Sequence, residues 1–382
     1  MTRTIAILTS VHGAKDGNDL LLDQKALEGL EFYARCWPGE VIWMLAMKVE
    51  PPSYAARCDP ASLPFSIIEV SEDRSDVASK LPAGALLVAS ADSFNDLDLA
   101  IRLPERVIYI IEYTLRTRID IIRQSALPWY RAARRRVWER ATERRRKAAL
   151  AAAAGLQCNG LPSFERYKAL SPNPMVFFDT RLVATDQIKP DRLAAKQARV
   201  KSGAPLRLAF SGRLNRMKGV HHILPLIDVL DSRGIDYVFE VFGDGDLAEM
   251  LRAKASDRLI VQGSVQFPDA WVNAMQDRVD LFVCTHPQGD PSCTYMEMLG
   301  CGVPIVGFAN EAWTSMSALG NLGLTVPIGD VEALGDAIER LDRDRHKLAD
   351  MMQASAQFST DRSMEKTFEA RLAHLGAIAE AT

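Results

Sequence analysis

Apolar runs of strand length alternate with longer amphipathic stretches along the first half of the chain. Residues 4–9 are apolar enough for a buried strand, and residues 23–35 repeat their apolar positions at helical spacing. Further strand-length apolar runs follow at residues 41–47, 65–70, 85–89, 106–111 and 175–178. Because helix-length segments separate several of these runs, the pattern favours a parallel sheet with helices on its faces.

The same alternation starts again in the second half. Strands are predicted at residues 206–210, 237–242, 259–261, 281–284 and 304–307. Helices are predicted at residues 220–230, 247–255, 271–275, 294–299, 331–341 and 363–379. Between the two series lies a polar, basic segment, residues 186–205, which contains Pro190 and a Ser-Gly-Ala-Pro sequence typical of a linker.

We therefore predict an α/β protein with two Rossmann-like, doubly wound domains. The domains are residues 1–185 and 206–360, joined by the linker 186–205. A C-terminal helix, residues 361–382, is expected to pack back on the first domain. Ligands of such sheets bind beyond the carboxyl ends of the strands, so the functional site is expected in a cleft between the two domains.

Composition narrows the function classes. The 382 residues are 48% hydrophobic and 25% charged, as in ordinary globular proteins, and the net charge of −3 gives no general attraction to nucleic acid. No apolar run approaches the roughly 20 residues of a membrane span, and we read no secretory signal. The six cysteines are scattered without metal-ligand spacing, so we expect reduced thiols and a cytoplasmic protein.

The most informative local pattern is residues 211–219, Ser-Gly-Arg-Leu-Asn-Arg-Met-Lys-Gly, between a predicted strand and a predicted helix. Gly212 lets the backbone approach a ligand closely, and the following helix start favours an anion. Arg213 and Lys218 add positive charge. The pattern is typical of a loop that holds a diphosphate, although each cation alone is also compatible with a surface salt bridge.

Residues 131–147 carry nine basic residues against two glutamates. Trp129, Tyr130 and Trp138 flank or interrupt them, so the segment is compatible with a helix lying on an anionic membrane surface. The apolar stripe is thin, however, and a solvated face or an arginine patch that receives an acidic or phosphorylated acceptor is equally compatible. We expect no nucleic-acid partner, because one basic helix in an acidic chain supports that role weakly.

Four motifs follow one another through the second half: the diphosphate loop at residues 211–219, the glycine turn at 241–245, the strand at 279–284 and the Glu-x4-Gly-x-Pro segment at 297–304. Their order and spacing resemble the nucleotide-sugar-binding domain of GT-B-fold glycosyltransferases, in particular the large retaining family 4 that builds bacterial polysaccharides and glycolipids. The first half resembles that family in architecture alone.

The resemblance implies a retaining, metal-independent transferase with a nucleoside-diphosphate sugar, UDP- or GDP-linked, as donor and no cofactor. It gives Arg213 and Lys218 the catalytic task of stabilising the leaving diphosphate. Glu297 would bind the ribose hydroxyls. Further donor contacts are expected from Gly13, Gly212, Gly243, Val265, His286, Ser292, Cys293 and Thr294. The acceptor would be a saccharide, a lipid-linked sugar or a small molecule.

Two positions depart from this pattern or leave alternatives. The family often has a second glutamate where this chain has Gly289, and the neighbouring Asp290 is expected to take over contact with the donor sugar as a catalytic residue, unless it caps the next helix. Ser292 is itself expected to cap that helix. His286 would bind donor phosphate or sugar, or only satisfy the backbone.

The first half is expected to bind the acceptor. The polar residues 10–19 read as a loop after the first strand, in which Gly13 would approach the donor and His12 and Lys15 would contact acceptor or phosphate, a solvated loop being the alternative. Glu112 follows a central strand, where it would bind the acceptor hydroxyl and act in catalysis, or form a buried pair.

Two other functions remain open from the sequence. One is a nucleotide-sugar epimerase of the same fold. The other is a non-catalytic scaffold that binds a nucleotide sugar or an acidic polymer, a reading that the missing glutamate at Gly289 keeps open.

Overall fold

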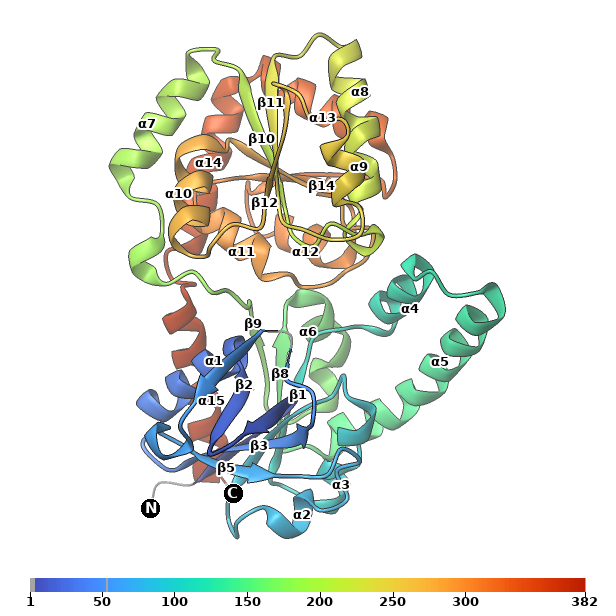
Figure 1. The fold of residues 1–382 in the computed structure, drawn as a ribbon, viewed down its shortest axis with the longest axis vertical. Helices are drawn as coiled ribbons and strands as arrows, with labels where there is room; N and C mark the ends of the chain where they lie inside the picture. Colours follow the sequence, from blue (N-terminus) through green and yellow to red (C-terminus); the bar gives the residue numbers. More distant parts are fainter. Residues whose placement is uncertain (1–3, 53, 382) are drawn as a thin grey trace.

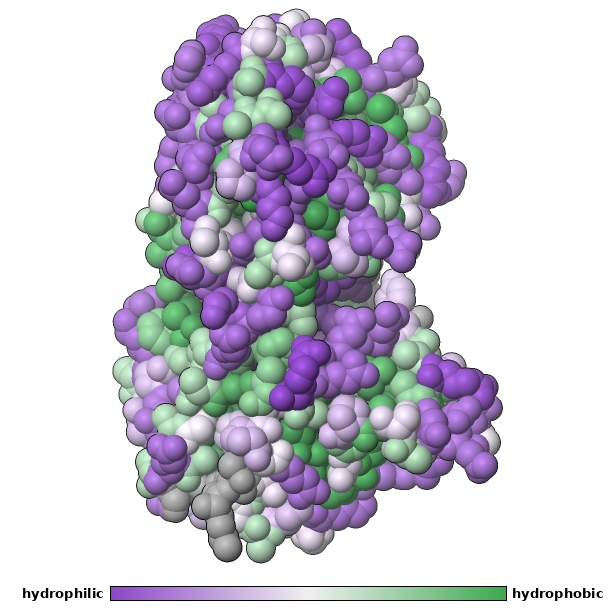
Figure 2. Space-filling model, turned by 90° about the vertical axis from the view of Figure 1, so that its left-hand side faces the viewer, coloured by the Kyte–Doolittle hydropathy of each residue, from purple (hydrophilic) through white to green (hydrophobic). Residues whose placement is uncertain are grey.

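Two sheets organise the molecule, one in each half of the chain (Figure 1). The computed structural model describes residues 4–52 and 54–381. The predicted fold, two Rossmann-like α/β domains, is confirmed. On the face drawn in Figure 2, hydrophilic residues cover most of the upper, C-terminal domain, whereas hydrophobic and hydrophilic areas are mixed on the N-terminal domain.

The N-terminal sheet has nine strands. They are β1 (Ile5–Asp16), β2 (Asp19–Asp23), β3 (Val41–Lys48), β4 (Ala55–Cys58), β5 (Ser66–Glu69), β6 (Leu86–Ser90), β7 (Val107–Ile111), β8 (Gly155–Asn159) and β9 (Pro174–Phe177). The parallel part runs β5-β3-β1-β6-β7-β8-β9, and β2 and β4 extend it antiparallel beside the end of β1. Its helices are α1 (Gln24–Cys36), α2 (Val77–Lys80), α3 (Leu99–Arg102), α4 (Leu115–Gln124), α5 (Trp129–Ala152) and α6 (Leu161–Tyr167).

The C-terminal sheet has six parallel strands in the order β12-β11-β10-β13-β14-β15. They are β10 (Leu206–Ser211), β11 (Tyr237–Phe242), β12 (Leu259–Gly263), β13 (Leu281–Cys284), β14 (Ile305–Phe308) and β15 (Gly323–Val326). The helices are α7 (Pro190–Lys201), α8 (Ile223–Ser232), α9 (Ala248–Arg252), α10 (Asp269–Arg278), α11 (Cys293–Gly300), α12 (Glu311–Ser317), α13 (Val331–Arg343), α14 (Arg345–Ser359) and α15 (Met364–Ala381).

Helices cover both faces of each sheet, and successive residues of a strand pack alternately against one face and the other. In β1, Ile5 and Ile7 pack on the side of α1 and α15, whereas Ala6 and Leu8 pack on the side of α3, α5 and α6. The C-terminal sheet is arranged likewise, with α8 and α13 on one face and α10 and α11 on the other. The functional loops therefore leave the sheets at their ends.

The chain crosses between the domains twice. Leu182, in the connection after β9, is buried in the C-terminal core, and the segment 186–205, expected to be a linker, contains α7 packed on α10 and α14. At the end of the chain α15 returns to the N-terminal domain, where Phe368 packs against Phe32 and Tyr33 at ring-centroid distances of 4.9 and 5.3 Å.

The expected loop at residues 10–19 is wrong for most of its length. β1 continues to Asp16, beyond a register shift between Leu8 and His12, and turns through residues 17–18 into β2. The polar residues there still form a strand, because strands pair through backbone hydrogen bonds and apolar side chains are not required for that pairing. The helix predicted from residue 220 starts with a 3₁₀ turn, Val220–His222, directly after the left-handed Gly219, and becomes α-helical at Ile223.

The basic segment lies in α5, a 24-residue helix that projects with α4 from the side of the N-terminal domain (Figure 1). Glu139 and Glu143 are buried, and Glu143 accepts bonds from Arg146 at 3.0 Å and from the Tyr167 hydroxyl at 2.9 Å. Both acids of the segment are thus turned inward. The exposed charged positions are all basic: Arg131, Arg134, Arg135, Arg140 and Arg144. Every helix in the described part of the chain is too short or too polar to traverse a bilayer.

Candidate functional site

The loop at residues 211–219 is folded tightly against the end of β13. The Asn215 side chain accepts from the backbone N–H of Lys218 at 3.0 Å, and the Thr285 hydroxyl donates to the Lys218 carbonyl at 3.1 Å. Gly219 has a φ of 73°, and a Cβ there would lie 1.8 Å from the carbonyl oxygen of Thr285. The glycine is therefore required by the close approach of two backbones, which fixes where Lys218 begins its side chain.

Gly212 and Gly243 lie where the loops after β10 and β11 meet. The Gly212 N–H donates to Phe242 O at 3.0 Å, and a Cβ on Gly243 would lie 2.0 Å from Gly212 O. Gly243 thus has a packing reason in the structure, whereas Gly212 has space for a Cβ and is favoured by its φ of 148°. Val265, predicted beside them, is half-buried against the same domain's core.

Lys218 and Asp290 form an ion pair at the cleft, the Lys218–Asp290 pair. Lys218 Nζ lies 2.6 Å from Asp290 Oδ2, and the lysine side chain is 9% exposed. Burial raises the pKa of Asp290, but Lys218 and, more weakly, Arg213 outweigh it, so the pKa lies below its ordinary value. Arg213 itself is exposed. Arg213, Lys218 and Asp290, all predicted site residues, are therefore close enough for their charges to interact.

The first turn of α11 has no side-chain cap. Ser292 occupies the cap position, but its hydroxyl bonds no first-turn N–H, so the expectation that it caps the helix is wrong. Cys293 Sγ instead donates to Asp179 Oδ2 of the N-terminal domain at 3.0 Å. Thr294 follows in the same turn. An uncapped helix start leaves N–H groups and a positive dipole end for an anion.

Glu297 lies one turn further along α11 and is 1% exposed. Its Oε1 accepts from Arg181 Nε at 2.9 Å, and the Arg181 guanidinium lies 4.0 Å from the centre of the Phe267 ring. Arg181 belongs to the connection after β9, outside any motif, so sequence reasoning missed it. In this arrangement the carboxylate of Glu297 is satisfied by another part of the protein.

His286 and Gln288 present buried polar atoms without partners. Among the described residues, both ring nitrogens of His286 and the side-chain nitrogen of Gln288 lack a hydrogen-bond partner. Burial, the largest cause, lowers the pKa of His286, so the ring is neutral. Unpaired buried polar groups are costly, which marks both side chains as candidates for bonding a ligand.

Gly289 has no room for a side chain because α4 crosses above it. A Cβ at this position would lie 2.7 Å from Thr117 Oγ1 and 3.0 Å from Glu311 Cβ. Thr114 and Thr117 both donate to Glu311 Oε2, at 2.5 and 2.9 Å, and join the two domains. The departure from the family pattern therefore has a steric reason, and these interdomain bonds were not predicted.

Glu112 faces the site from the N-terminal domain. Its backbone N–H donates to Asp92 Oδ2 at 2.7 Å, and its Oε1 accepts from Asn159 Nδ2 at 3.2 Å. Burial, then the charge of Asp92, raise the pKa of Glu112 to about 7, and Asp179 and Asp290 add to the effect. The structure thus brings Glu112 within electrostatic reach of the Lys218–Asp290 pair.

The other N-terminal candidates are engaged within their own domain. His12 Nε2 lies 3.1 Å from Glu50 O, and Lys15 pairs with Glu69 at 2.9 Å. A Cβ on Gly13 would lie 2.9 Å from Met47 Sδ. These contacts of His12, Lys15 and Gly13 lie within the described N-terminal domain, and none of them reaches the Lys218–Asp290 pair.

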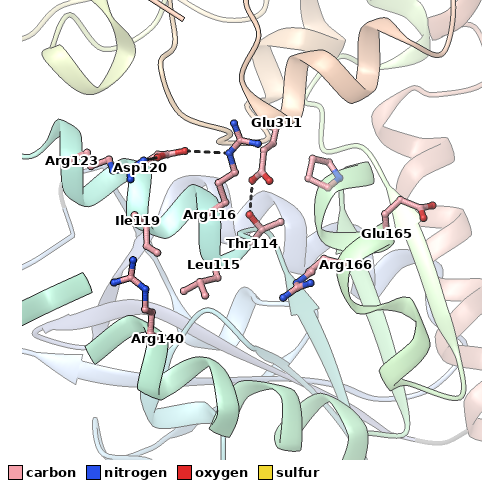
Figure 3. Close-up of a pocket in the computed structure, with 11 residues that line it drawn as sticks. Thr114, Leu115, Arg116, Ile119, Asp120, Arg123, Arg140, Glu165, Arg166 and Glu311 are labelled. Carbon is pink, nitrogen blue, oxygen red and sulfur yellow. Dashed lines mark hydrogen bonds and ion pairs between the residues drawn. The ribbon is translucent and has the colours of Figure 1, made fainter. Parts of the chain in front are cut away.

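A cavity of about 610 Å³ lies beside the domain junction, between α4, α5, α6 and the start of α12 (Figure 3). Thr114 and Glu311, which bridge the domains, form part of its wall. Its other lining residues are Leu115, Arg116, Ile119, Asp120, Arg123, Arg140, Pro162, Glu165 and Arg166. Of the basic segment 131–147, Arg140 lines this cavity.

Residues 205–344 match the family described as glycosyl transferases group 1. The chain is 28% identical over 161 residues to 2-deoxystreptamine N-acetyl-D-glucosaminyltransferase of Streptomyces fradiae, covering 39% of this chain and 38% of that protein. It is 28% identical over 206 residues to a GDP-mannose-dependent alpha-(1-6)-phosphatidylinositol monomannoside mannosyltransferase of Mycolicibacterium smegmatis, covering 50% and 54%. The matches thus span about half or less of these relatives.

Solved structures match over nearly the whole chain. HepE of Anabaena in complex with UDP has a TM-score of 0.65 at 15% identity, covering 98% of this chain and 99% of that one. Sucrose-phosphate synthase of Thermosynechococcus elongatus has a TM-score of 0.64 at 15% identity, covering 99% and 98%. At such identity the likeness concerns the fold.

Proposed function

We propose that this chain, which has the GT-B fold and whose residues 205–344 match the glycosyl transferases group 1 family, transfers a sugar from a nucleoside-diphosphate sugar to an acceptor hydroxyl. The observation that carries the proposal is the Lys218–Asp290 pair, a nearly buried ammonium beside an uncapped helix start. Both features attract a diphosphate.

The donor would bind by exchange of contacts. Its diphosphate would draw Lys218 from Asp290 and take first-turn N–H groups of α11, with Arg213 adding charge from the exposed side of the loop. Its ribose hydroxyls would replace the guanidinium of Arg181 on Glu297. Lys218 and Glu297 thus have a partner before and after binding, which limits the cost of binding.

The sugar would lie toward His286, Gln288 and Asp290. The unpaired nitrogens of His286 and Gln288 supply hydrogen-bonding groups that sugar hydroxyls satisfy. Asp290, once Lys218 turns to phosphate, would be a free carboxylate that takes the role of the glutamate missing at position 289. UDP and GDP are the nucleotides we propose, since HepE of Anabaena was crystallised with UDP and the mycobacterial relative is GDP-mannose-dependent.

We propose transfer with retention, in which the acceptor hydroxyl attacks on the side from which the diphosphate leaves. Lys218 and Arg213 would stabilise the charge that grows on the diphosphate, and this diphosphate would take the proton of the acceptor hydroxyl. Glu112, with a pKa of about 7, would bind that hydroxyl and orient it.

The surroundings proposed for the reaction are the cytoplasm and the surface of an anionic membrane. The six cysteines are free in the structure, as is typical of a reducing compartment. Trp129, Tyr130 and Val137 are exposed on α5 among outward arginines, a composition that suits headgroups of anionic lipids. Saccharides and lipid-linked sugars are the acceptor classes that this placement favours.

The proposal is tested by nucleotide binding and turnover in one panel. Thermal shifts with UDP, GDP and ADP identify the base, and nucleotide release from the matching sugar nucleotides measures turnover. Slow release that requires Lys218 and persists in Arg216→Ala, a change at an exposed residue of the same loop, supports a transferase. Interconversion of two sugars would indicate an epimerase, and tight binding without release a scaffold; either outcome contradicts the proposal.

A further inference from the structure

The arginine cavity, lined by Arg116, Arg123, Arg140 and Arg166, draws its cations from three separate helices. Arg116 and Arg123 come from α4, Arg140 from α5 and Arg166 from α6. Its volume of about 610 Å³ lies in the range of small-molecule sites. Helices this far apart in sequence bring their arginines together only through the tertiary fold.

The carboxylates of the cavity are already engaged. Asp120, Glu165 and Glu311 each have partners within the protein. Those partners are Arg116 at 3.8 Å and Arg123 at 2.7 Å for Asp120, Lys168 at 2.6 Å for Glu165, and the Thr114 and Thr117 hydroxyls for Glu311. The lining itself has four arginines and three carboxylates, an excess of one positive charge, and Lys168, which lies outside the lining, neutralises Glu165.

Arg140 and Arg166 are the cations left over. In the described part of the chain, no ion pair joins either of them to a carboxylate. Figure 3 shows both on the side of the cavity opposite Asp120 and Glu311. A ligand with negative charge would therefore meet two guanidinium groups that no carboxylate neutralises.

The chemistry of the lining favours a phosphate group. All four cations are arginines, whose planar guanidinium forks match phosphate oxygens in pairs, and several forks can share one doubly charged group. The start of α4 is already capped by the Thr114 side chain and carries the Glu311 carboxylate on Thr114 and Thr117, so the arginines supply the attraction for a further anion. We propose that the arginine cavity binds a phosphate group carried by the acceptor.

The cavity is close enough to the donor site for such an acceptor to reach both. Thr114, in its wall, follows Glu112 by two residues, and α4 also packs against the turn at Arg216–Lys218. Thr117 of the same helix lies against Gly289. A molecule held by its phosphate beside α4 can therefore extend toward Glu112 and the Lys218–Asp290 pair.

This inference rests on the proposed function and names a chemical class for its acceptor. A phosphate group can come from a lipid headgroup or from a soluble phosphorylated saccharide. The exposed α5, which supplies Arg140, suits the first source, and the cavity volume of about 610 Å³ suits the second. Experiments on binding separate the two.

The test compares two double variants of the full chain. Arg140→Ala with Arg166→Ala removes the two unpaired cations, and Arg134→Ala with Arg144→Ala removes two outward arginines of α5 as a matched control. Inorganic phosphate at pH 8 is titrated calorimetrically into each, and acetate into the wild type. We expect phosphate affinity to fall by about tenfold or more in the first variant and by less than about twofold in the control. Arg140→Lys with Arg166→Lys should lie between, since charge stays and the fork is lost.

A second arm uses vesicles of equal parts phosphatidylglycerol and phosphatidylcholine. Vesicle binding that falls more in the cavity variant than in the control supports a lipid phosphate, and vesicle binding that does not, with phosphate binding lost, supports a soluble one. Equal phosphate affinity in the cavity variant and the control would overturn the inference, as would acetate binding as tightly as phosphate. Absent nucleotide binding with intact phosphate binding in the cavity would refute the proposed function instead.

Discussion

The two sides of the cleft are built in different ways. On the C-terminal side, the site is made of loops that follow consecutive strands, and backbones approach so closely that Gly219 and Gly243 admit no Cβ. On the N-terminal side, the candidate site is made of side chains. Glu112 comes from a strand end, and the four arginines of the cavity come from three helices.

The difference explains why one half is easy to read and the other is not. A loop that must let two backbones touch constrains its own sequence, so glycines and cations stay at fixed spacing. A cavity assembled from side chains of separate helices imposes no local spacing, because each helix contributes one or two residues at any position that faces inward. The following experiments break or sharpen this contrast, from the largest expected effect to the smallest.

Replacing Gly219 with alanine tests the backbone-built side. The added Cβ would lie 1.8 Å from Thr285 O in a residue with φ of 73°, so we expect a loss of about 4 kcal/mol or more in the free energy of unfolding. Gly234→Ala is the matched control, since its φ is 65° and its Cβ would meet nothing within 4 Å. It should cost roughly 1–2 kcal/mol. Equal losses in chemical denaturation would show that the contact with Thr285 is not required.

Replacing Lys218 with alanine tests the cation that this backbone positions. Removing it takes away stabilisation of the leaving diphosphate and leaves Asp290 buried without its partner, so kcat/KM should fall by about 100-fold. Arg216→Ala, in the same turn but exposed, should stay within about twofold. Circular dichroism verifies folding of both, and wild-type turnover in Lys218→Ala would remove this residue from the site.

Replacing Glu112 with glutamine tests the side-chain-built half through its pH dependence. The folded protein binds the Glu112 proton more tightly than the unfolded chain, with a pKa of about 7 against 4.5. The wild type therefore loses stability as pH rises from about 4.5 to about 7, and Glu112→Gln lacks this loss. Unfolding free energies at pH 5 and pH 8 should shift in favour of the variant by on the order of 1–2 kcal/mol. A pH-independent difference between the two proteins would contradict the raised pKa.

Replacing Thr117 with valine tests the junction between the two sides. The variant keeps the shape of the side chain but loses one of two hydroxyl bonds to Glu311, which weakens the closed arrangement by about 1 kcal/mol. Small-angle X-ray scattering should then detect a larger mean radius of gyration in the free protein. Thr314→Val, an exposed change on α12, serves as the control and should leave the radius unchanged. A wild-type radius in Thr117→Val would mean that other contacts hold the domains together.

The sequence pattern located most of the strands and the fold because buried parallel strands must be continuous apolar runs. It did not find β2 and β4, which are half-exposed at the sheet edge, or α7, whose apolar residues Leu193 and Val200 are too few for a clear period. Among site residues, Lys218 and Asp290 were predicted individually, but their ion pair was not. Arg181, Thr117 and the cations of the cavity outside α5 carried no signal, since each depends on a neighbour far along the chain.

By itself the sequence determined two α/β domains in series and a C-terminal half whose loops are shaped for a nucleotide. Buried strands require apolar residues and close backbone approach requires glycine, so both features can be read from residue types. The tertiary structure decided how the halves meet. It made α4 cross over Gly289 and exclude a side chain there, raised the pKa of Glu112 by burial and then by the charge of Asp92, and placed arginines of three helices around one cavity. These features depend on distances between segments remote in sequence, and only the folded chain sets those distances.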